Sequence, residues 1–124
     1  MTAPPIAFTA DLAALLPASV RERIELELLR ESPSAAALRV LATIRDERWP
    51  EFVYAARIDW AAMLQWARGN TASNSVAVRV ELAASLAGWM HARPELCKAA
   101  YALDGDNFRA FLDALRIARE GLER

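Results

Sequence analysis

Cysteine and histidine are nearly missing from this sequence, which contains one of each, Cys97 and His91. A single cysteine excludes an internal disulfide, and the pair is too small for a His/Cys cluster of the kind that binds zinc. Pro94 lies between the two residues, so a cysteine–histidine dyad would require the chain to turn back on itself. We expect His91 at the polar edge of a helix and Cys97 packed as a small hydrophobic residue.

An excess of positive charge and long apolar runs are missing as well. Fifteen Lys and Arg residues oppose sixteen Asp and Glu residues, for a formal net charge of -1, whereas nucleic-acid-binding domains are usually clearly basic. No uncharged stretch approaches the ~18 residues that a membrane-spanning helix needs, and the first 16 residues lack the basic segment of a signal peptide. The sequence therefore predicts a cytoplasmic protein without a membrane contact, and it disfavours nucleic acid as a partner.

Motifs of catalysis and cofactor binding are also absent. The sequence has no glycine-rich phosphate loop, no Gly-x-Ser-x-Gly and no His-Glu-x-x-His. Residues 104–107, Asp-Gly-Asp-Asn, are similar to the start of a calcium loop, but the bidentate glutamate that completes such a loop is missing. A turn that caps a following helix explains them better. We predict a protein without enzymatic activity, with no catalytic, cofactor-binding or metal-binding residues.

Helix-forming residues are abundant. Ala, Leu, Arg and Glu dominate, and each loses little free energy on entering a helix. The predicted fold is all-α, with six or seven helices as antiparallel hairpins, in a helical bundle or in a short HEAT/TPR-like α–α stack. Turns near Ser32, Gly69 and Gly105 are 37 and 36 residues apart, a spacing typical of stacked helical hairpins. Residues 78–88 also resemble the second helix of a HEAT repeat.

A single all-α domain is predicted over residues 9–124, after a flexible arm over residues 1–8 that Pro4 and Pro5 keep out of a helix. Helices are predicted at residues 9–16, 20–31, 33–48, 51–68, 76–92, 95–103 and 108–122. The apolar residues of segment 20–31 alternate as in a strand, but its Leu, Glu and Arg content favours a helix.

The last predicted helix has the clearest amphipathic pattern. The face that we predict to be buried carries Phe108, Phe111, Leu112, Leu115, Ala118 and Leu122. The opposite, polar face carries Arg109, Asp113, Arg116 and Glu120.

Two charged residues, Asp59 and Arg79, interrupt apolar helix faces. In one interpretation the helix over 51–68 breaks at Ile58, and Asp59 caps a new helix that begins at Trp60. In the other, the helix is continuous and Asp59 is a buried carboxylate that needs a partner. Asp59 and Arg79 each lie about ten residues from the Gly69 turn, so this alternative predicts a buried ion pair between them across an antiparallel hairpin.

We expect an interaction or adaptor protein that binds a protein partner or forms a homo-oligomer. The predicted contact residues are Tyr54, Arg57, Ile58 and Trp66. Tyr54 and Ile58 would lie four positions apart on the otherwise polar side of their helix, which is the spacing with which one helix contacts another.

A DNA-binding regulator is the first alternative. Residues 64–79 loosely resemble a helix-turn-helix: a first helix ends at Gly69, a Ser/Thr/Asn-rich turn follows, and a second helix begins. Arg79 and the polar residues at the start of that second helix would then contact phosphates or base edges. A small enzyme of unknown class is the second alternative.

Overall fold

The computed structural model describes residues 5–45, 48–69 and 73–123, and it confirms the all-α class. The described residues form eight α-helices, one 3₁₀ helix (η1) and one two-stranded sheet. None of the helices described here has both the length and the apolarity that crossing a membrane requires. In chain order the elements are α1 (Thr9–Leu15), α2 (Ala18–Arg23), α3 (Leu26–Arg30), α4 (Ser32–Leu41), η1 (Trp49–Phe52), β1 (Val53–Tyr54), β2 (Arg57–Ile58), α5 (Trp60–Arg68), α6 (Asn74–Leu86), α7 (Leu96–Ala102) and α8 (Gly105–Glu120).

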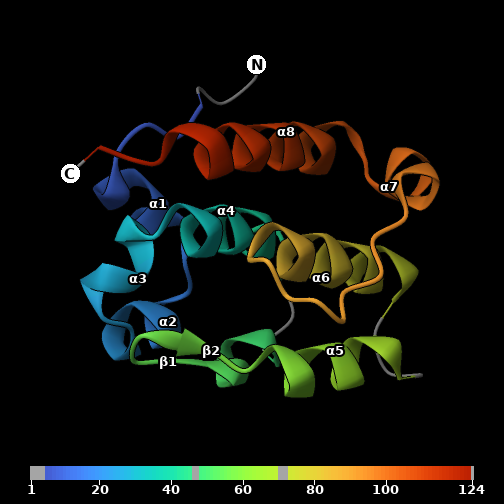
Figure 1. The fold of residues 1–124 in the computed structure, drawn as a ribbon, viewed down its shortest axis with the longest axis horizontal. Helices are drawn as coiled ribbons and strands as arrows, with labels where there is room; N and C mark the ends of the chain where they lie inside the picture. Colours follow the sequence, from blue (N-terminus) through green and yellow to red (C-terminus); the bar gives the residue numbers. More distant parts are fainter. Residues whose placement is uncertain (1–4, 46–47, 70–72, 124) are drawn as a thin grey trace.

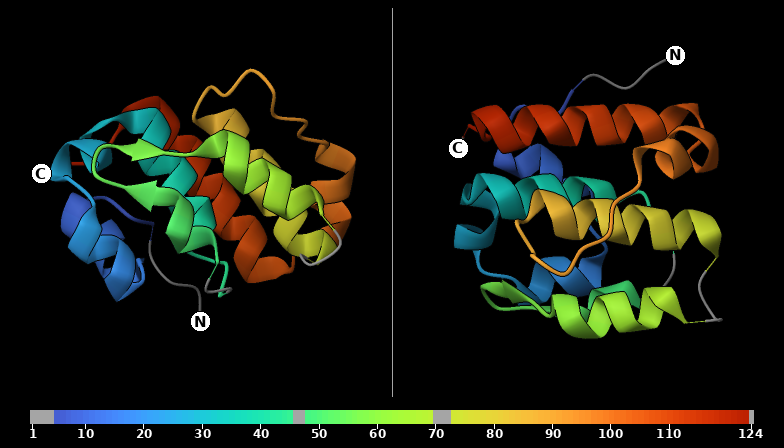
Figure 2. Two further views of the ribbon diagram at one scale, coloured as in Figure 1. Left: turned by 90° about the horizontal axis from the view of Figure 1, so that it is seen from below. Right: turned by 45° about the vertical axis from the view of Figure 1, so that its right-hand side comes forward.

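The elements are arranged in three layers (Figures 1 and 2). α8 forms one outer layer, α4 and α6 form the middle layer, and α5 with the β1–β2 hairpin forms the other outer layer. Contacts of α4 with α8 and of α5 with α6 join these layers, and contacts of α4 with α6 hold the middle layer together. The middle helices are therefore covered on two sides, and residues 35–38 of α4 and 82–84 of α6 are buried.

Tryptophan side chains contribute to the core of the molecule. Trp49 is fully buried, and its indole Nε1 donates a hydrogen bond to the Ile44 carbonyl at 2.9 Å, so that burial leaves its N–H satisfied. Trp60 is also buried, and Trp66 and Trp89 are partly buried against the same core.

Side-chain caps set the start of two long helices. Ser73 accepts a hydrogen bond from Val76 N at the start of α6, and Asp104 accepts one from Asn107 N at the start of α8. Residues 104–107 are therefore a capping turn, as predicted, although α8 begins three residues earlier than expected. α4 and α6 end early, at Leu41 and Leu86, instead of near residues 48 and 92.

The single helix predicted over residues 20–31 is wrong: two short helices, α2 and α3, occupy this segment, and Ile24 and Glu25 between them are extended. Ile24 forms a bridge with Ala55, and Glu25 N donates to the Ala55 carbonyl at 2.9 Å. Ala55 N in turn donates to the Arg23 carbonyl at 3.0 Å. Tertiary hydrogen bonds to the hairpin thus outweigh the helical propensity at this point.

The helix predicted over residues 51–68 is wrong in its first half. β1 and β2 pair antiparallel there, with Val53 opposite Ile58, and the turn between them holds Ala55 at φ +52°. α5 begins at Trp60, and the Asp59 carboxylate caps it by accepting a hydrogen bond from Ala62 N at 3.1 Å. The interpretation with a break at Ile58 and a cap at Asp59 is confirmed.

The segment predicted as a flexible arm makes tertiary contacts where it is described; residues 1–4 lie outside the described part. Ile6 N donates to Asp113 Oδ2 at 3.0 Å. Glu123 N donates to the Ala7 carbonyl at 2.8 Å, and Thr9 N donates to the Glu123 carbonyl at 2.9 Å. Residues 6–9 are therefore fastened to α8 and to the segment that follows it.

Candidate functional site

α8 packs on α4 through small side chains. Ala110, Ala114 and Ile117 of α8 are at most 2% exposed, and Ala35 and Ala36 of α4 are fully buried. Small side chains allow two helix axes to approach closely, and α8 lies along α4 in every view of the fold (Figures 1 and 2). The side of α8 that meets the domain is thus rich in alanine.

Three large apolar residues of α8 face the solvent: Phe108 is 36% exposed, Leu112 50% and Leu115 43%. The prediction that they are buried is wrong. Because they are four and three positions apart, they lie on one line along the helix, and we call them the apolar stripe. The other members of the predicted face are buried or half-buried: Phe111, Ala118 and Leu122.

One residue of the stripe contacts the buried side of α8. The Phe108 ring packs edge-on against Phe111, with 6.3 Å between the ring centroids. Single exposed apolar residues are common on soluble proteins, but an i, i+4, i+7 series on one helix is the pattern with which helices contact partner helices. We therefore take the stripe as the candidate site.

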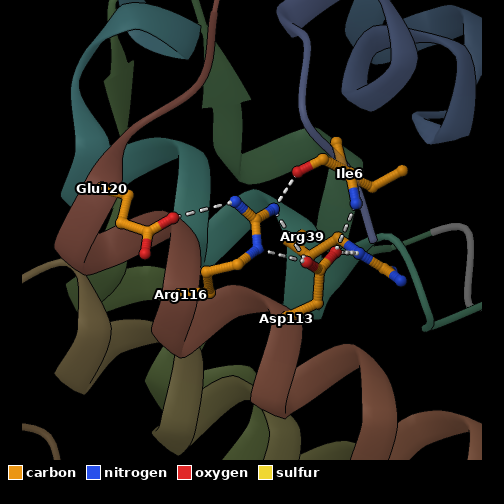
Figure 3. A network of polar contacts seen from close by, with 5 residues as sticks. All are labelled: Ile6, Arg39, Asp113, Arg116 and Glu120. Atoms are coloured by element: carbon orange, nitrogen blue, oxygen red, sulfur yellow. Dashed lines mark hydrogen bonds and ion pairs between the residues drawn. The ribbon is translucent and has the colours of Figure 1, made fainter. Parts of the chain in front are cut away.

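A partly buried ionic network joins the polar side of α8 to α4 and to Ile6 (Figure 3). Asp113 Oδ2 accepts from Arg39 Nε of α4 at 2.9 Å and from Ile6 N at 3.0 Å. Asp113 Oδ1 accepts from two nitrogens of Arg116, at 2.9 and 3.2 Å. Arg116 also donates to the Ile6 carbonyl and forms an ion pair with Glu120 at 3.5 Å.

The Asp113 side chain is 7% exposed, yet its carboxylate is held in the charged form. Burial by itself would raise the pKa of Asp113, but hydrogen bonds from Arg39, from the Ile6 amide and from Arg116 outweigh it. The pKa of Asp113 therefore lies below the usual value for an aspartate. Asp113 and Arg116 were predicted on the polar outer face of their helix, and Asp113 in fact points toward α4.

A groove of about 1140 Å³ runs beside this network, between the end of α4 and the start of α8. Five arginines and three aspartates line it, so that its lining carries a net charge of +2 in a chain of net charge -1. Leu112 of the apolar stripe lies at its edge. We call this feature the arginine groove; its charged residues are Arg39, Arg45, Arg79, Arg109, Arg116, Asp104, Asp106 and Asp113.

Arg79 is buried, with 8% of its surface exposed. Its guanidinium donates to the carbonyl and hydroxyl of Thr43, at 2.9 and 3.0 Å, and to the carbonyl and hydroxyl of Ser75, at 3.2 and 3.1 Å. Burial lowers the pKa of Arg79, and the charge of Asp104 acts in the opposite direction.

The ion pair predicted between Asp59 and Arg79 does not form. None of the ion pairs between described residues joins these two side chains. Asp59 is engaged as the cap of α5, and polar groups of Thr43 and Ser75 satisfy Arg79 without a carboxylate. The sequence pattern showed correctly that Arg79 is buried, but it did not identify the partners, which come from the end of α4 and from one turn earlier in α6.

The four predicted contact residues do not share a helix face. Tyr54 and Arg57 face each other in the hairpin, with the guanidinium carbon 5.4 Å from the ring centroid, and both are exposed. Ile58 is half-buried opposite Val53, and Trp66 is half-buried against Phe52, at 6.1 Å between ring centroids. The hairpin lies in the outer layer opposite α8 (Figure 1), so Tyr54 and Arg57 belong to a different surface from the apolar stripe.

Residues 64–79 form an antiparallel helical hairpin, apart from residues 70–72, which lie outside the described part (Figure 1). Arg68 at the end of α5 makes two hydrogen bonds of 2.9 Å to the Glu81 carboxylate of α6. α6 lies in the middle layer, and Arg79 is committed to internal hydrogen bonds. Arg79 cannot contact a DNA base edge without breaking these bonds.

The two residues that are rare in this sequence lie apart from any cluster. Cys97 is an exposed free thiol, which corrects the expectation that it packs as a hydrophobic residue. His91 lies beyond the end of α6, exposed, with its ring 5.9 Å from that of Trp89. Within residues 5–45, 48–69 and 73–123, no group of three or more His, Cys, Asp or Glu side chains is arranged to hold a metal ion.

Comparison of the chain with models of protein families, with curated proteins and with solved structures gave no match. The function must therefore be argued from the surface itself. The sequence did contain the signal for the apolar stripe. Ala110, Ala114 and Ile117 widen the apolar arc of α8 well beyond what one neighbouring helix can cover, and this width predicts a second contact on the same helix.

Proposed function

We propose that the protein is a non-enzymatic interaction domain that binds a partner protein through the apolar stripe of α8. The exposure of Phe108, Leu112 and Leu115 supports this, because α8 already buries a different apolar side on α4. Covering the stripe would remove apolar surface from water, which favours association by roughly 25 cal/mol for each Å² buried. The packing of α8 on α4 by itself does not explain why three large apolar residues on one helix are exposed to water.

The stripe is separable from the fold. Ala110, Ala114 and Ile117 anchor α8 on α4, and the Asp113 network holds its polar side. Substitution of an exposed stripe residue should therefore change binding without unfolding the domain. Leu26 of α3 offers a matched control, because it is 62% exposed and belongs to a helix outside the stripe.

The test is capture of partners by the tagged full chain from nuclease-treated lysate of its native source, followed by reconstitution with the purified partner. We expect Leu112→Glu to lose the partner and Leu26→Glu to retain it, with both variants showing the circular dichroism spectrum of the parent. Equal retention by the parent and by Leu112→Glu would contradict the proposal. Partners that disappear after nuclease treatment would instead favour the DNA-binding alternative.

Light scattering on the purified chain tests whether the partner is a second copy. If the measured mass rises with concentration from 13.7 kDa to twice that value, and the mass of Leu112→Glu does not rise, the stripe mediates self-association. A constant mass of one chain leaves a different protein as the partner.

A further inference from the structure

Arginines border the apolar stripe along one side and at its C-terminal end. Arg109 and Arg116 stand three positions before and four positions after Leu112 and lie on that side. Arg119, four positions after Leu115, continues the line of the stripe. The side chains of Arg109 and Arg116 are 58% and 31% exposed, and Arg119 is exposed as well. We call these three residues the arginine border.

The positive charge beside the stripe is only partly neutralised within the domain. Asp113 pairs with both Arg39 and Arg116, Glu120 also pairs with Arg116 at 3.5 Å, and Arg109 pairs with Asp106 at 3.0 Å. The hydrogen bonds of Arg79 given above are to uncharged groups, and Arg45 is exposed at the rim of the groove. The charged residues of the groove lining, which includes Leu112, sum to +2, and Glu120, which pairs with Arg116 from outside the lining, reduces this to +1.

A second copy of the chain fits this surface poorly. Two copies of α8 packed antiparallel through their stripes, about a two-fold axis, would bring the same edge of each helix together. Arg109 of one copy would then approach Arg116 of the other, and the repulsion between these like charges opposes association. A partner with negative charge along one edge of an apolar face has no such conflict.

We propose that the partner presents an acidic amphipathic helix, whose apolar side covers Phe108, Leu112 and Leu115 and whose carboxylates face the arginine border and the arginine groove. This inference rests on the proposed function and adds the chemistry of the partner. Hydrophobic contact supplies the affinity, and the charges select the partner, fix its orientation and speed its approach at low salt. Because the charges are exposed, added salt weakens the complex.

Two synthetic helical peptides test the inference on the full-length protein. Both carry Leu at i, i+4 and i+7; one has Glu along one flank of the leucines, and the other has Lys at the same positions. By fluorescence anisotropy at low salt we expect the acidic peptide to bind about tenfold more tightly than the basic one, since several exposed charge pairs change sign. Molar salt should remove this difference.

Variants of the protein assign the effect to the named residues. Arg109→Glu/Arg119→Glu should lose the preference for the acidic peptide, and Leu112→Glu should lose both peptides. Arg21→Glu, an exposed arginine of α2, is the matched charge-reversal control and should bind like the parent.

Four results would overturn the inference. Neither peptide binding, both binding equally, or a preference that persists in Arg109→Glu/Arg119→Glu would each show that charge beside the stripe does not select the partner. A natural partner that is captured by the parent, lost by Leu112→Glu and retained by Arg109→Glu/Arg119→Glu would do the same, while leaving the proposed function intact. A failure of the proposed function itself gives a different result: the parent and Leu112→Glu then capture the same partner equally.

Discussion

Arg39 of α4 donates a hydrogen bond from Nε to Oδ2 of Asp113 of α8 over 2.9 Å, with 14% and 7% of the two side chains exposed. This contact joins residues 74 positions apart in the chain. It draws the polar side of α8 toward α4, and the opposite rotation would be needed to bury Leu112 and Leu115. The rotation of α8 that forms this ion pair is the one that leaves the apolar stripe exposed.

Replacing Asp113 by Asn should destabilise the domain by about 2–4 kcal/mol, because it leaves two half-buried guanidinium groups without their shared carboxylate. Urea unfolding followed by tryptophan fluorescence measures the change. Asp106→Asn is the control: Asp106 also pairs with an arginine of α8 but is 92% exposed, so its loss should change the midpoint little. Equal effects of the two substitutions would show that the Asp113 network does not hold α8.

Stability should fall in acid because of two carboxylates. Burial alone would raise the pKa values of Asp113 and Glu81, but arginine and backbone hydrogen bonds outweigh it and leave both pKa values lowered in the folded state. Their contribution is complete above the unfolded pKa values, about 3.9 for Asp and 4.3 for Glu, and is lost as the pH falls through the lower folded values. Urea midpoints between pH 7 and pH 2 measure this decline.

The parent protein and Asp113→Asn should differ in this titration. The variant starts less stable at pH 7 and loses less on acidification, so the two curves converge at low pH. Parallel curves would mean that Asp113 has the same pKa in the folded and unfolded chains.

Asp59 and Arg79 should act independently. Asp59→Ala removes the cap of α5 and should cost about 1 kcal/mol, and Arg79→Met removes the hydrogen bonds to Thr43 and Ser75. In a double-mutant cycle we expect the two free energies of unfolding to add within about 0.5 kcal/mol. The same cycle on Arg39→Met and Asp113→Asn should show a clear interaction energy, because those side chains touch. A large interaction energy between Asp59→Ala and Arg79→Met would instead indicate that Asp59 and Arg79 form an ion pair.

Ala55→Gly should stabilise the hairpin. Ala55 has φ +52°, a left-handed conformation that costs an L-residue with a Cβ atom about 1 kcal/mol or more, and glycine avoids that cost. Part of the gain is offset by the greater freedom of glycine in the unfolded chain, so we expect a net stabilisation of about 0.5 kcal/mol. Ala56→Gly next to it should instead destabilise, since Ala55 is the only non-glycine residue with positive φ in the described chain. A lower melting temperature for Ala55→Gly would contradict this reading of the turn.

Local features of the fold could be predicted from the sequence because they depend on neighbouring residues. The break at Ile58 with its cap at Asp59 and the capping turn at residues 104–107 are of this kind, since a side-chain oxygen reaches a backbone N–H only three positions away. The all-α class followed in the same way from helix-forming residues and their spacing.

The candidate site needed the tertiary structure. Periodicity measures how wide the apolar arc of α8 is, but it does not say which part of the arc meets α4. That choice depends on Arg39, which lies far away in the sequence and pairs with Asp113, and on the alanines of α4, which match Ala110 and Ala114.

The amino-acid sequence by itself determined the helical class and the capping residues at the starts of α5 and α8, because these follow from contacts within a few positions of each residue. Only the tertiary structure decided that Asp113 is buried and that Phe108, Leu112 and Leu115 face the solvent. The physical reason is that the side of α8 that meets α4 depends on contacts between distant segments, the Arg39–Asp113 ion pair and the close helix contact, which no local pattern contains.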